Sequence, residues 1–304
     1  MTTVSSDVID ISVHGNGSNR SFWNGILSTS PLALTAPSCA FLEYGVVQRQ
    51  GPRPHQEDRF LFKRNDMHAF FGIFDGHGGF ECAEHVRDSL HDHIMNHPEF
   101  STNLPEAIHH GVSLTDSIWL QNCIQNSANI SGTTGVFGFI RDNVLTVGNV
   151  GDSRCILSRK GHAVELSVDQ KPWRPDEKAR IERSGGWVDP KGMLLGYISM
   201  SRSFGDIAMK SFRSLQFPGV SLHDDVFICV PEIRQVTLSH EDEFIILASD
   251  GLWGRVTNEK AVKIARDSLK RYQDPKRAAE DLIEEGYREG SMDNTTVLVI
   301  IVNK

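Results

Sequence analysis

The sequence is poor in cysteine and has no Cys-x-x-Cys pair. Its five cysteines are scattered along the 304 residues, at Cys39, Cys82, Cys123, Cys155 and Cys229. An odd and dispersed set argues against a disulfide framework and against a thiolate zinc site. A reducing compartment suits such a chain, so we expect a cytoplasmic or nuclear protein.

Long apolar runs and a surplus of basic residues are also missing. No apolar stretch reaches the roughly 20 residues of a membrane span, and the first residues form neither a signal peptide nor a myristoylation site. The net charge is −8, whereas nucleic-acid binders usually carry a basic face. We therefore expect no membrane contact and no nucleic-acid partner. We also expect a monomer.

Two segments of different composition divide the chain. Residues 1–38 are rich in Ser, Thr, Asn and Gly, which predicts an irregular N-terminal extension. Residues 39–304 show punctuated strand and helix patterns, and 39% of the whole chain is hydrophobic, enough for a substantial core. We expect this second segment to form one catalytic domain.

Apolar periodicity predicts strands and helices in blocks. Strands are expected at residues 44–48, 59–63, 69–74, 134–141, 144–150, 154–158, 227–238, 243–248 and 297–302. Helices are expected at residues 80–96, 104–124, 175–184, 258–271 and 275–289. Blocks rather than strict alternation favour an α+β fold with layered packing. The close succession of the strands between residues 134 and 158 predicts an antiparallel meander.

Three aspartates lie beside apolar strands and are followed by small or turn-forming residues: Asp75, Asp250 and Asp293. Any one of them alone more often caps backbone amides in a turn. The three together indicate a shared centre, because buried carboxylates repel one another and are costly to desolvate unless cations neutralise them. Glu57 and Asp58 form a fourth acidic element.

Oxygen ligands, with a backbone carbonyl at Gly76, favour Mg²⁺ or Mn²⁺ over zinc. Two such ions about 3.5–4 Å apart would lower the pKa of a bridging water and present hydroxide to phosphorus. The acidic set therefore predicts the hydrolysis of a phosphate ester.

Two further residues have a chemical role open to them. His77 can donate a proton to a departing alkoxide, or it can hydrogen-bond a metal-bound water. Arg53 can present a planar fork to phosphate oxygens, although an arginine near a proline turn is more often a surface residue. The histidines in and around the first two helices do not converge, and we expect them on a solvated face: His85, His91, His93, His97, His109 and His110.

The order of motifs along the chain is specific. It runs Arg53 to Asp58, Asp75-Gly-His-Gly-Gly79, Ser131-Gly-Thr-Thr134, Gly151-Asp-Ser-Arg154, Asp169-Gln-Lys-Pro172, Glu182 to Val188, Ser201 to Asp206, Ser249-Asp-Gly-Leu-Trp253 and Gly290 to Asn294. From about residue 40 to residue 304, this series resembles the metal-dependent PPM family of serine/threonine phosphatases, the protein phosphatase 2C type.

The resemblance implies a β-sandwich of two antiparallel sheets flanked by α-helices, a four-layer αββα fold, and the dephosphorylation of phosphoserine and phosphothreonine in phosphoprotein substrates. By motif position, Glu57, Asp75 and the Gly76 carbonyl would hold one Mg²⁺ or Mn²⁺ ion. Asp75, Asp250 and Asp293 would hold the second ion, with Asp58 supporting them from behind. Arg53 would bind the substrate phosphate, and His77 would be the general acid.

Two positions depart from the family pattern. Gly254 stands where relatives carry an Asp that, with residues matching Asp152 and Asp250, binds a third and weaker metal. We therefore expect two well-bound ions and a weakened third site. Gln170 replaces a common His but lies outside the metal ligands.

A catalytically impaired pseudophosphatase that binds phosphoproteins is the alternative function. The segment over residues 203–230 corresponds to the family's variable flap, which is either a specificity element or a polar surface loop.

Overall fold

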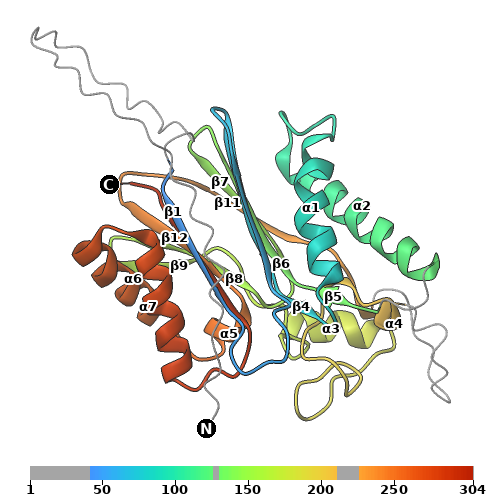
Figure 1. Ribbon diagram of the computed structural model, residues 1–304. Helices are drawn as coiled ribbons and strands as arrows, with labels where there is room; N and C mark the ends of the chain where they lie inside the picture. Colours follow the sequence, from blue (N-terminus) through green and yellow to red (C-terminus); the bar gives the residue numbers. More distant parts are fainter. Residues whose placement is uncertain (1–41, 126–129, 211–225, 304) are drawn as a thin grey trace, which may run out of the picture.

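The computed structural model describes residues 42–125, 130–210 and 226–303. The predicted extension over residues 1–38 and most of the flap segment lie outside the described residues. Two five-stranded antiparallel sheets form the centre of the molecule (Figure 1). The first sheet has the order β1 (Tyr44–Arg49), β13 (Thr295–Ile301), β12 (Asp242–Ala248), β8 (Arg154–Arg159) and β9 (His162–Glu165). The second sheet has the order β11 (Glu232–Thr237), β7 (Val144–Val150), β6 (Gly135–Arg141), β3 (His68–Phe74) and β2 (Arg59–Arg64).

Helices cover the outer face of each sheet. Helices α1 (Glu81–Met95) and α2 (Leu104–Gln125) pack on the second sheet, and α6 (Asn258–Tyr272) and α7 (Pro275–Arg288) pack on the first (Figure 1). The alternation of side chains along a strand produces this layering. In β3, Phe70 and Phe74 join the core under α1 and α2, whereas Phe71 and Ile73 join the core between the sheets. The predicted αββα sandwich is confirmed.

Three pairs of residues form a third, small sheet with the order β10 (Phe204–Gly205), β5 (Gly132–Thr133) and β4 (Gly76–His77). It lies at the same end of the molecule as the short helices α3 (Pro175–Arg183), α4 (Ile207–Lys210) and α5 (Asp250–Trp253) (Figure 1). Helix α3 begins at its proline, as predicted, and ends at Arg183, one residue before the expected end. No sequence pattern predicts the small sheet, because two-residue strands are too short to show a periodicity.

The predicted meander is wrong at its third strand. Strand β7 pairs with β6, but β8 pairs with β12 and β9 in the other sheet. The chain crosses between sheets in the Gly151 turn, where φ is +104°, a conformation that glycine adopts without steric cost. The strand expected at residues 227–238 is also shorter, since β11 begins only at Glu232.

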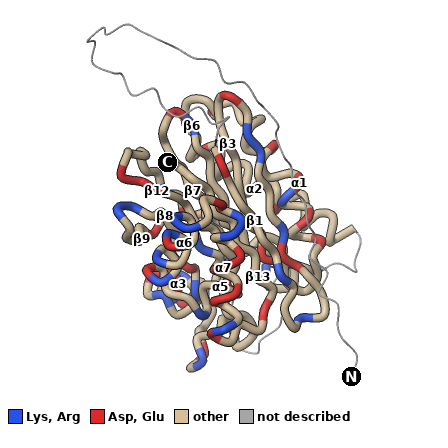
Figure 2. The backbone as a smooth tube through the Cα atoms, turned by 60° about the vertical axis from the view of Figure 1, so that its left-hand side comes forward, with Lys and Arg blue, Asp and Glu red and all other residues tan. Residues whose placement is uncertain are grey.

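The prediction that the helix histidines lie on a solvated face is wrong for His91. Its side chain is buried against Phe70 and Phe139, with ring centroids 5.1 and 6.2 Å away, and burial lowers its pKa. Basic and acidic residues are interspersed along the backbone tube in Figure 2. None of the described helices combines the length and apolarity that crossing a membrane requires.

Candidate metal centre

The predicted carboxylates lie at one end of both large sheets. In the second sheet, Asp75 follows β3, Asp152 follows β7, and Asp58 precedes β2, the antiparallel neighbour of β3. In the first sheet, Asp250 follows β12, and Asp293 precedes β13, the antiparallel neighbour of β12. Antiparallel pairing brings the end of one strand beside the start of the next. Four of these carboxylates, those of Asp58, Asp250, Asp152 and Asp293, act electrostatically on the fifth, Asp75. The structure therefore brings together residues that are more than 200 positions apart in sequence.

Asp58 lies at the base of this group and is fully buried. Its Oδ2 accepts hydrogen bonds from the hydroxyls of Ser249 and Thr296 at 2.9 and 2.7 Å. Its Oδ1 has no partner. Burial raises the pKa of Asp58 to about 6, against those two hydrogen bonds.

Asp75 and Asp250 have raised pKa values for related reasons. Burial and then the charges of Asp58, Asp250 and Asp152 raise the pKa of Asp75 well above its ordinary value. Burial and the charge of Asp152 raise that of Asp250 to about 7, although Lys171 acts in the opposite direction. Neighbouring carboxylates oppose each other's ionisation, and a bound cation would relieve that repulsion.

The residues fit a hard cation. Two buried carboxylate oxygens, Oδ1 of Asp58 and Oδ1 of Asp152, have no hydrogen-bond partner, and carboxylate oxygens are the ligands that Mg²⁺ and Mn²⁺ prefer. Gly76 follows Asp75 in a cramped position, because a Cβ there would lie 2.5 Å from the Glu57 carbonyl oxygen. The predicted ligands do not, however, form a compact single-ion cluster.

Among the described residues, one group of acidic side chains is compact enough for a single ion, with ligand atoms within 4.8 Å of one another: Asp176, Glu177 and Glu232. Arginines already neutralise this group. Arg202 bonds both Glu177 and Glu232, and Arg174 bonds Asp176 and Glu232. We therefore interpret it as an ion-pair network rather than a metal site.

Glu57 and Arg53 lie at the rim of the acidic group. The Glu57 carboxylate accepts a hydrogen bond from the Gly79 backbone N–H at 3.0 Å. Arg53 donates to Oδ2 of Asp293 at 2.7 Å, and both side chains are partly exposed. Arg53 thus contacts a predicted ligand, at the entrance to the centre.

His77 contacts Asp206, a residue for which no role was predicted. Its Nε2 lies 2.8 Å from Oδ2 of Asp206. Burial lowers the pKa of His77, but the hydrogen bond and charge of Asp206, with Asp152 and Glu57, outweigh it and raise the pKa. The available sequence signal was the position of Asp206 at the end of the motif Ser201 to Asp206.

Two observations bear on the third metal position that the resemblance implies. Lys171 forms an ion pair with Oδ2 of Asp152, and Gly254 is exposed with no side chain to offer. Gln170 supports the same turn, since its Oε1 accepts a hydrogen bond from the Gly151 N–H at 2.6 Å. Gln170 thus helps to position the turn that carries Asp152. This role was not predicted, because Gln170 is not one of the expected metal ligands.

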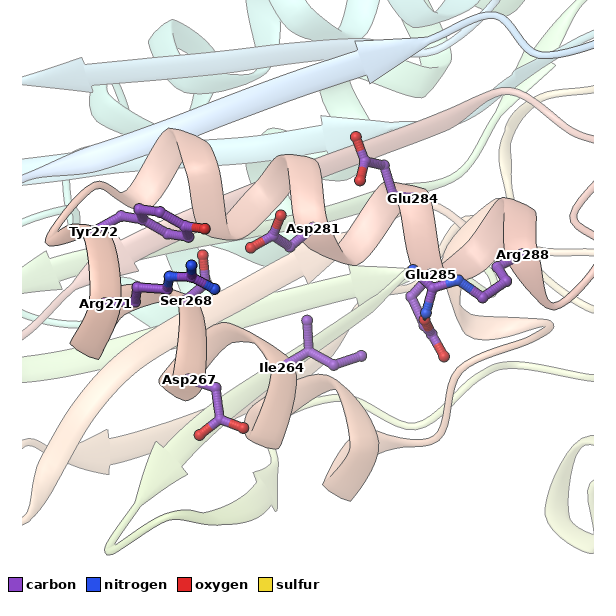
Figure 3. Close-up of a pocket in the computed structure, with 9 residues that line it drawn as sticks. All are labelled: Ile264, Asp267, Ser268, Arg271, Tyr272, Asp281, Glu284, Glu285 and Arg288. Atoms are coloured by element: carbon purple, nitrogen blue, oxygen red, sulfur yellow. The ribbon is translucent and has the colours of Figure 1, made fainter.

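A cavity of about 360 Å³ lies elsewhere, between α6 and α7 (Figure 3). It is lined by Ile264, Asp267, Ser268, Arg271, Tyr272, Asp281, Glu284, Glu285 and Arg288. None of the predicted site residues contributes to it.

An acidic centre at one end of a helix-covered β-sandwich is the arrangement expected of the metal-dependent phosphatases that the motifs resemble. The profile of the family described as "Protein phosphatase 2C" matches residues 42–295. The chain therefore belongs to the protein phosphatase 2C family. The prediction of a phosphatase of this family is confirmed.

Plant proteins are among the similar sequences. "Probable protein phosphatase 2C 45" of Oryza sativa subsp. japonica is 37% identical over 263 residues, covering 84% of this chain and 86% of the relative. "Probable protein phosphatase 2C 11" of Arabidopsis thaliana is 38% identical over 263 residues, covering 84% of this chain and 66% of the relative. The chain spans 65% and 50% of two further rice relatives.

Solved structures share the fold. A serine-threonine phosphatase 2C from Toxoplasma gondii matches with a TM-score of 0.73 and 24% identity, covering 88% of this chain and 96% of that one. A C. elegans sex determining protein matches with a TM-score of 0.74 and 21% identity, covering 86% of this chain and 65% of that one. At these identities the likeness establishes the architecture.

Proposed function

We propose that this protein is a metal-dependent protein serine/threonine phosphatase that hydrolyses phosphoserine and phosphothreonine by direct attack of water. The observation that carries the proposal is that Asp75, Asp250 and Asp293 lie at the same end of the two sheets, where the charges of Asp250 and Asp293 act on the carboxylate of Asp75. Two Mg²⁺ or Mn²⁺ ions, when bound, would supply positive charge and a water of lowered pKa.

The residues of this chain have separate roles in the proposal. Glu57, Asp75, the Gly76 carbonyl, Asp250 and Asp293 would hold the ions. Asp58, fixed by two hydroxyl groups, would keep Asp75 in place from behind.

The remaining roles concern the substrate. Arg53 would orient the substrate phosphate, because its guanidinium lies at the rim and reaches Asp293. His77 would donate a proton to the departing serine or threonine oxygen.

Asparagine substitutions test the ligand roles, because they remove charge and preserve shape. Asp75→Asn and Asp250→Asn should each lower phosphate release from a phosphoserine peptide in Mn²⁺ by about 10³-fold or more. Charge stabilisation of several kcal/mol is at stake, and each 1.4 kcal/mol is about tenfold in rate. Retention of full activity in either variant would overturn the ligand assignment.

Asp142→Asn is the matched control. Asp142 is 89% exposed, and its φ of +51° is one that Asn accepts readily. Its activity should equal that of the unmodified protein. Elemental analysis after dialysis against Mn²⁺ should give about two ions per chain, since Asp152 is paired with Lys171 and Gly254 offers no ligand.

The altered third position favours a second candidate, a pseudophosphatase that binds phosphoproteins. It predicts that the same phosphopeptide binds without turnover, with or without Mn²⁺. Stoichiometric phosphate release that requires Mn²⁺ excludes this candidate.

A further inference from the structure

The small sheet holds His77 beside Asp206. His77 ends β4, Gly132 pairs with it from β5, and Gly205 of β10 pairs with Gly132 on its other side. Asp206 follows Gly205 directly, so His77 and Asp206 flank the same residue of the central strand. Their side chains meet at 2.8 Å, between Nε2 and Oδ2.

Gly132 leaves the space in which this pair forms. A Cβ at this position would lie 2.2 Å from Oδ2 of Asp206 and 2.6 Å from Nε2 of His77. Since real Cβ atoms do not approach other atoms so closely, any side chain here would separate the two residues. The pair therefore depends on the absence of a side chain on β5.

Asp206 is fixed from several directions. The Ser203 hydroxyl donates to its Oδ2, and its backbone has φ of +52°, a strained conformation that the surrounding contacts must maintain. The backbone N–H of the preceding Gly205 donates to the buried Asp116 at 2.8 Å. Lys210 binds both oxygens of Asp116 and the Ser203 carbonyl, at 2.7 to 2.8 Å.

The contact with Asp206 also determines which nitrogen of His77 remains available. Nε2 is engaged by Asp206, whereas Nδ1 has no hydrogen-bond partner among the described residues. A carboxylate that accepts from one ring nitrogen fixes both the orientation of the imidazole and the atom that can exchange a proton.

We propose that Asp206 is a positioning residue for His77, holding Nε2–H so that Nδ1 donates the proton to the leaving oxygen. This inference rests on the proposed function, in which His77 is the general acid. As water attacks phosphorus and the bond between phosphorus and the serine or threonine oxygen breaks, the proton passes from Nδ1 to that oxygen. Nε2–H stays hydrogen-bonded to Asp206, and the proton that the attacking water releases passes through solvent to restore the Nδ1 proton.

Substrates that differ in their leaving group test the proposal. A serine alkoxide needs a proton as it departs, whereas p-nitrophenolate leaves without one. Asp206→Asn should lower kcat for a phosphoserine peptide by about 10- to 100-fold, part of the 10²- to 10⁴-fold that general acids contribute. KM should stay within about twofold, and the rate on p-nitrophenyl phosphate should fall by less than about threefold.

His77→Gln provides the comparison. It should show the same selective loss, and the double variant should lose little more than His77→Gln alone, because the two residues act as a unit. Ser203→Ala, which removes one hydrogen bond from Asp206, should give a smaller loss with the same selectivity.

A physical readout complements the kinetics. The Nε2–H proton of His77 should be visible and protected from exchange by NMR in the unmodified protein, and it should be lost in Asp206→Asn. Melting temperatures verify that each variant is folded. If Asp206→Asn does not fold, Ser203→Ala and Asp206→Glu decide the question by the same ratio of rates.

The outcomes distinguish a failure of the role proposed for Asp206 from a failure of the proposed function. Equal loss on both substrates in Asp206→Asn, with selective loss in His77→Gln, would overturn the role of Asp206 and leave the proposed function intact. Absence of selectivity in His77→Gln would remove the general acid itself. No hydrolysis of either substrate by the unmodified protein would contradict the proposed function.

Discussion

At the residue scale, Glu177 and Asp75 show how neighbours determine the state of a carboxylate. Glu177 is 1% exposed, and it accepts hydrogen bonds from Arg202, Arg180 and Ser201. Burial opposes its ionisation, but these partners outweigh burial and lower its pKa to about 2. Asp75 has carboxylates around it, and its pKa is raised. Arginines neutralise the carboxylate of Glu177, and the proposed metal ions would neutralise that of Asp75.

Glu177→Gln should lower the free energy of unfolding at pH 7 by about 2–4 kcal/mol, because it removes one counter-charge from Arg202 and from Arg180. The folded-state pKa of about 2 lies below the ordinary 4.5, so this stabilisation is complete above about pH 5. It is lost as the pH falls towards 2. Urea unfolding at several pH values should show the two proteins converging in acid, and a difference independent of pH would contradict this explanation.

Site residues could be predicted only where a local sequence pattern marks them. Asp75, Asp250 and Asp293 were recognisable because each lies beside a strongly apolar strand. The partners that fix other groups were not recognisable, since Asp206 meets His77 across 129 positions. The Lys171 contact with Asp152 spans only 19 positions, but it depends on the turn that Gln170 holds. Such pairings follow from the folded backbone and have no local pattern.

At the element scale, periodicity predicted most long helices and strands to within a few residues, but not which sheet each strand joins. Strand β8 has the same apolar character as β6 and β7, yet the chain crosses in the Gly151 turn and β8 joins the other sheet. Packing between elements is equally hidden from a local pattern. Helix α7 begins directly against the backbone of β1, which only the glycine at position 45 permits.

Gly45→Ala should destabilise the protein, because the added Cβ would lie 2.0 Å from the Lys276 backbone nitrogen. The start of α7 must then move away from β1, and overpacking of this kind costs about 1–3 kcal/mol or more. Gly286→Ala, a substitution within α7 itself, is the control. Its Cβ would have ordinary contacts of 3.5 Å or more, and alanine favours helix by up to about 1 kcal/mol. Equal stability of both variants in urea would contradict the close packing.

At the scale of the whole molecule, the acidic centre joins the two halves of the sandwich. Asp58, Asp75 and Asp152 adjoin the second sheet, whereas Asp250 and Asp293 adjoin the first. The apolar core between the sheets, which includes Phe71, Leu247 and Leu298, holds the halves together. Repulsion among the carboxylates acts against that core at one end. Metal binding and the stability of the entire domain should therefore be linked.

Asp250→Asn makes this link measurable. In EDTA the variant should melt at a higher temperature than the unmodified protein, because one charge that repels Asp75 and Asp152 is removed. Added Mn²⁺ should reverse the order. An ion that binds only the folded state stabilises it by about 2.7 kcal/mol at 100 times its Kd, and the variant has lost a ligand.

Asp142→Asn should follow the unmodified protein in both conditions, since its exposed turn lies outside the centre. If Asp250→Asn melts lower than the unmodified protein in EDTA, carboxylate repulsion does not limit stability. If both proteins respond equally to Mn²⁺, Asp250 does not bind the stabilising ion. Higher stability in EDTA combined with a weaker response to Mn²⁺ is specific to a carboxylate that binds a cation. Replacing a carboxylate in a structural ion pair, such as Glu177, would instead lower the stability of the protein both in EDTA and in Mn²⁺.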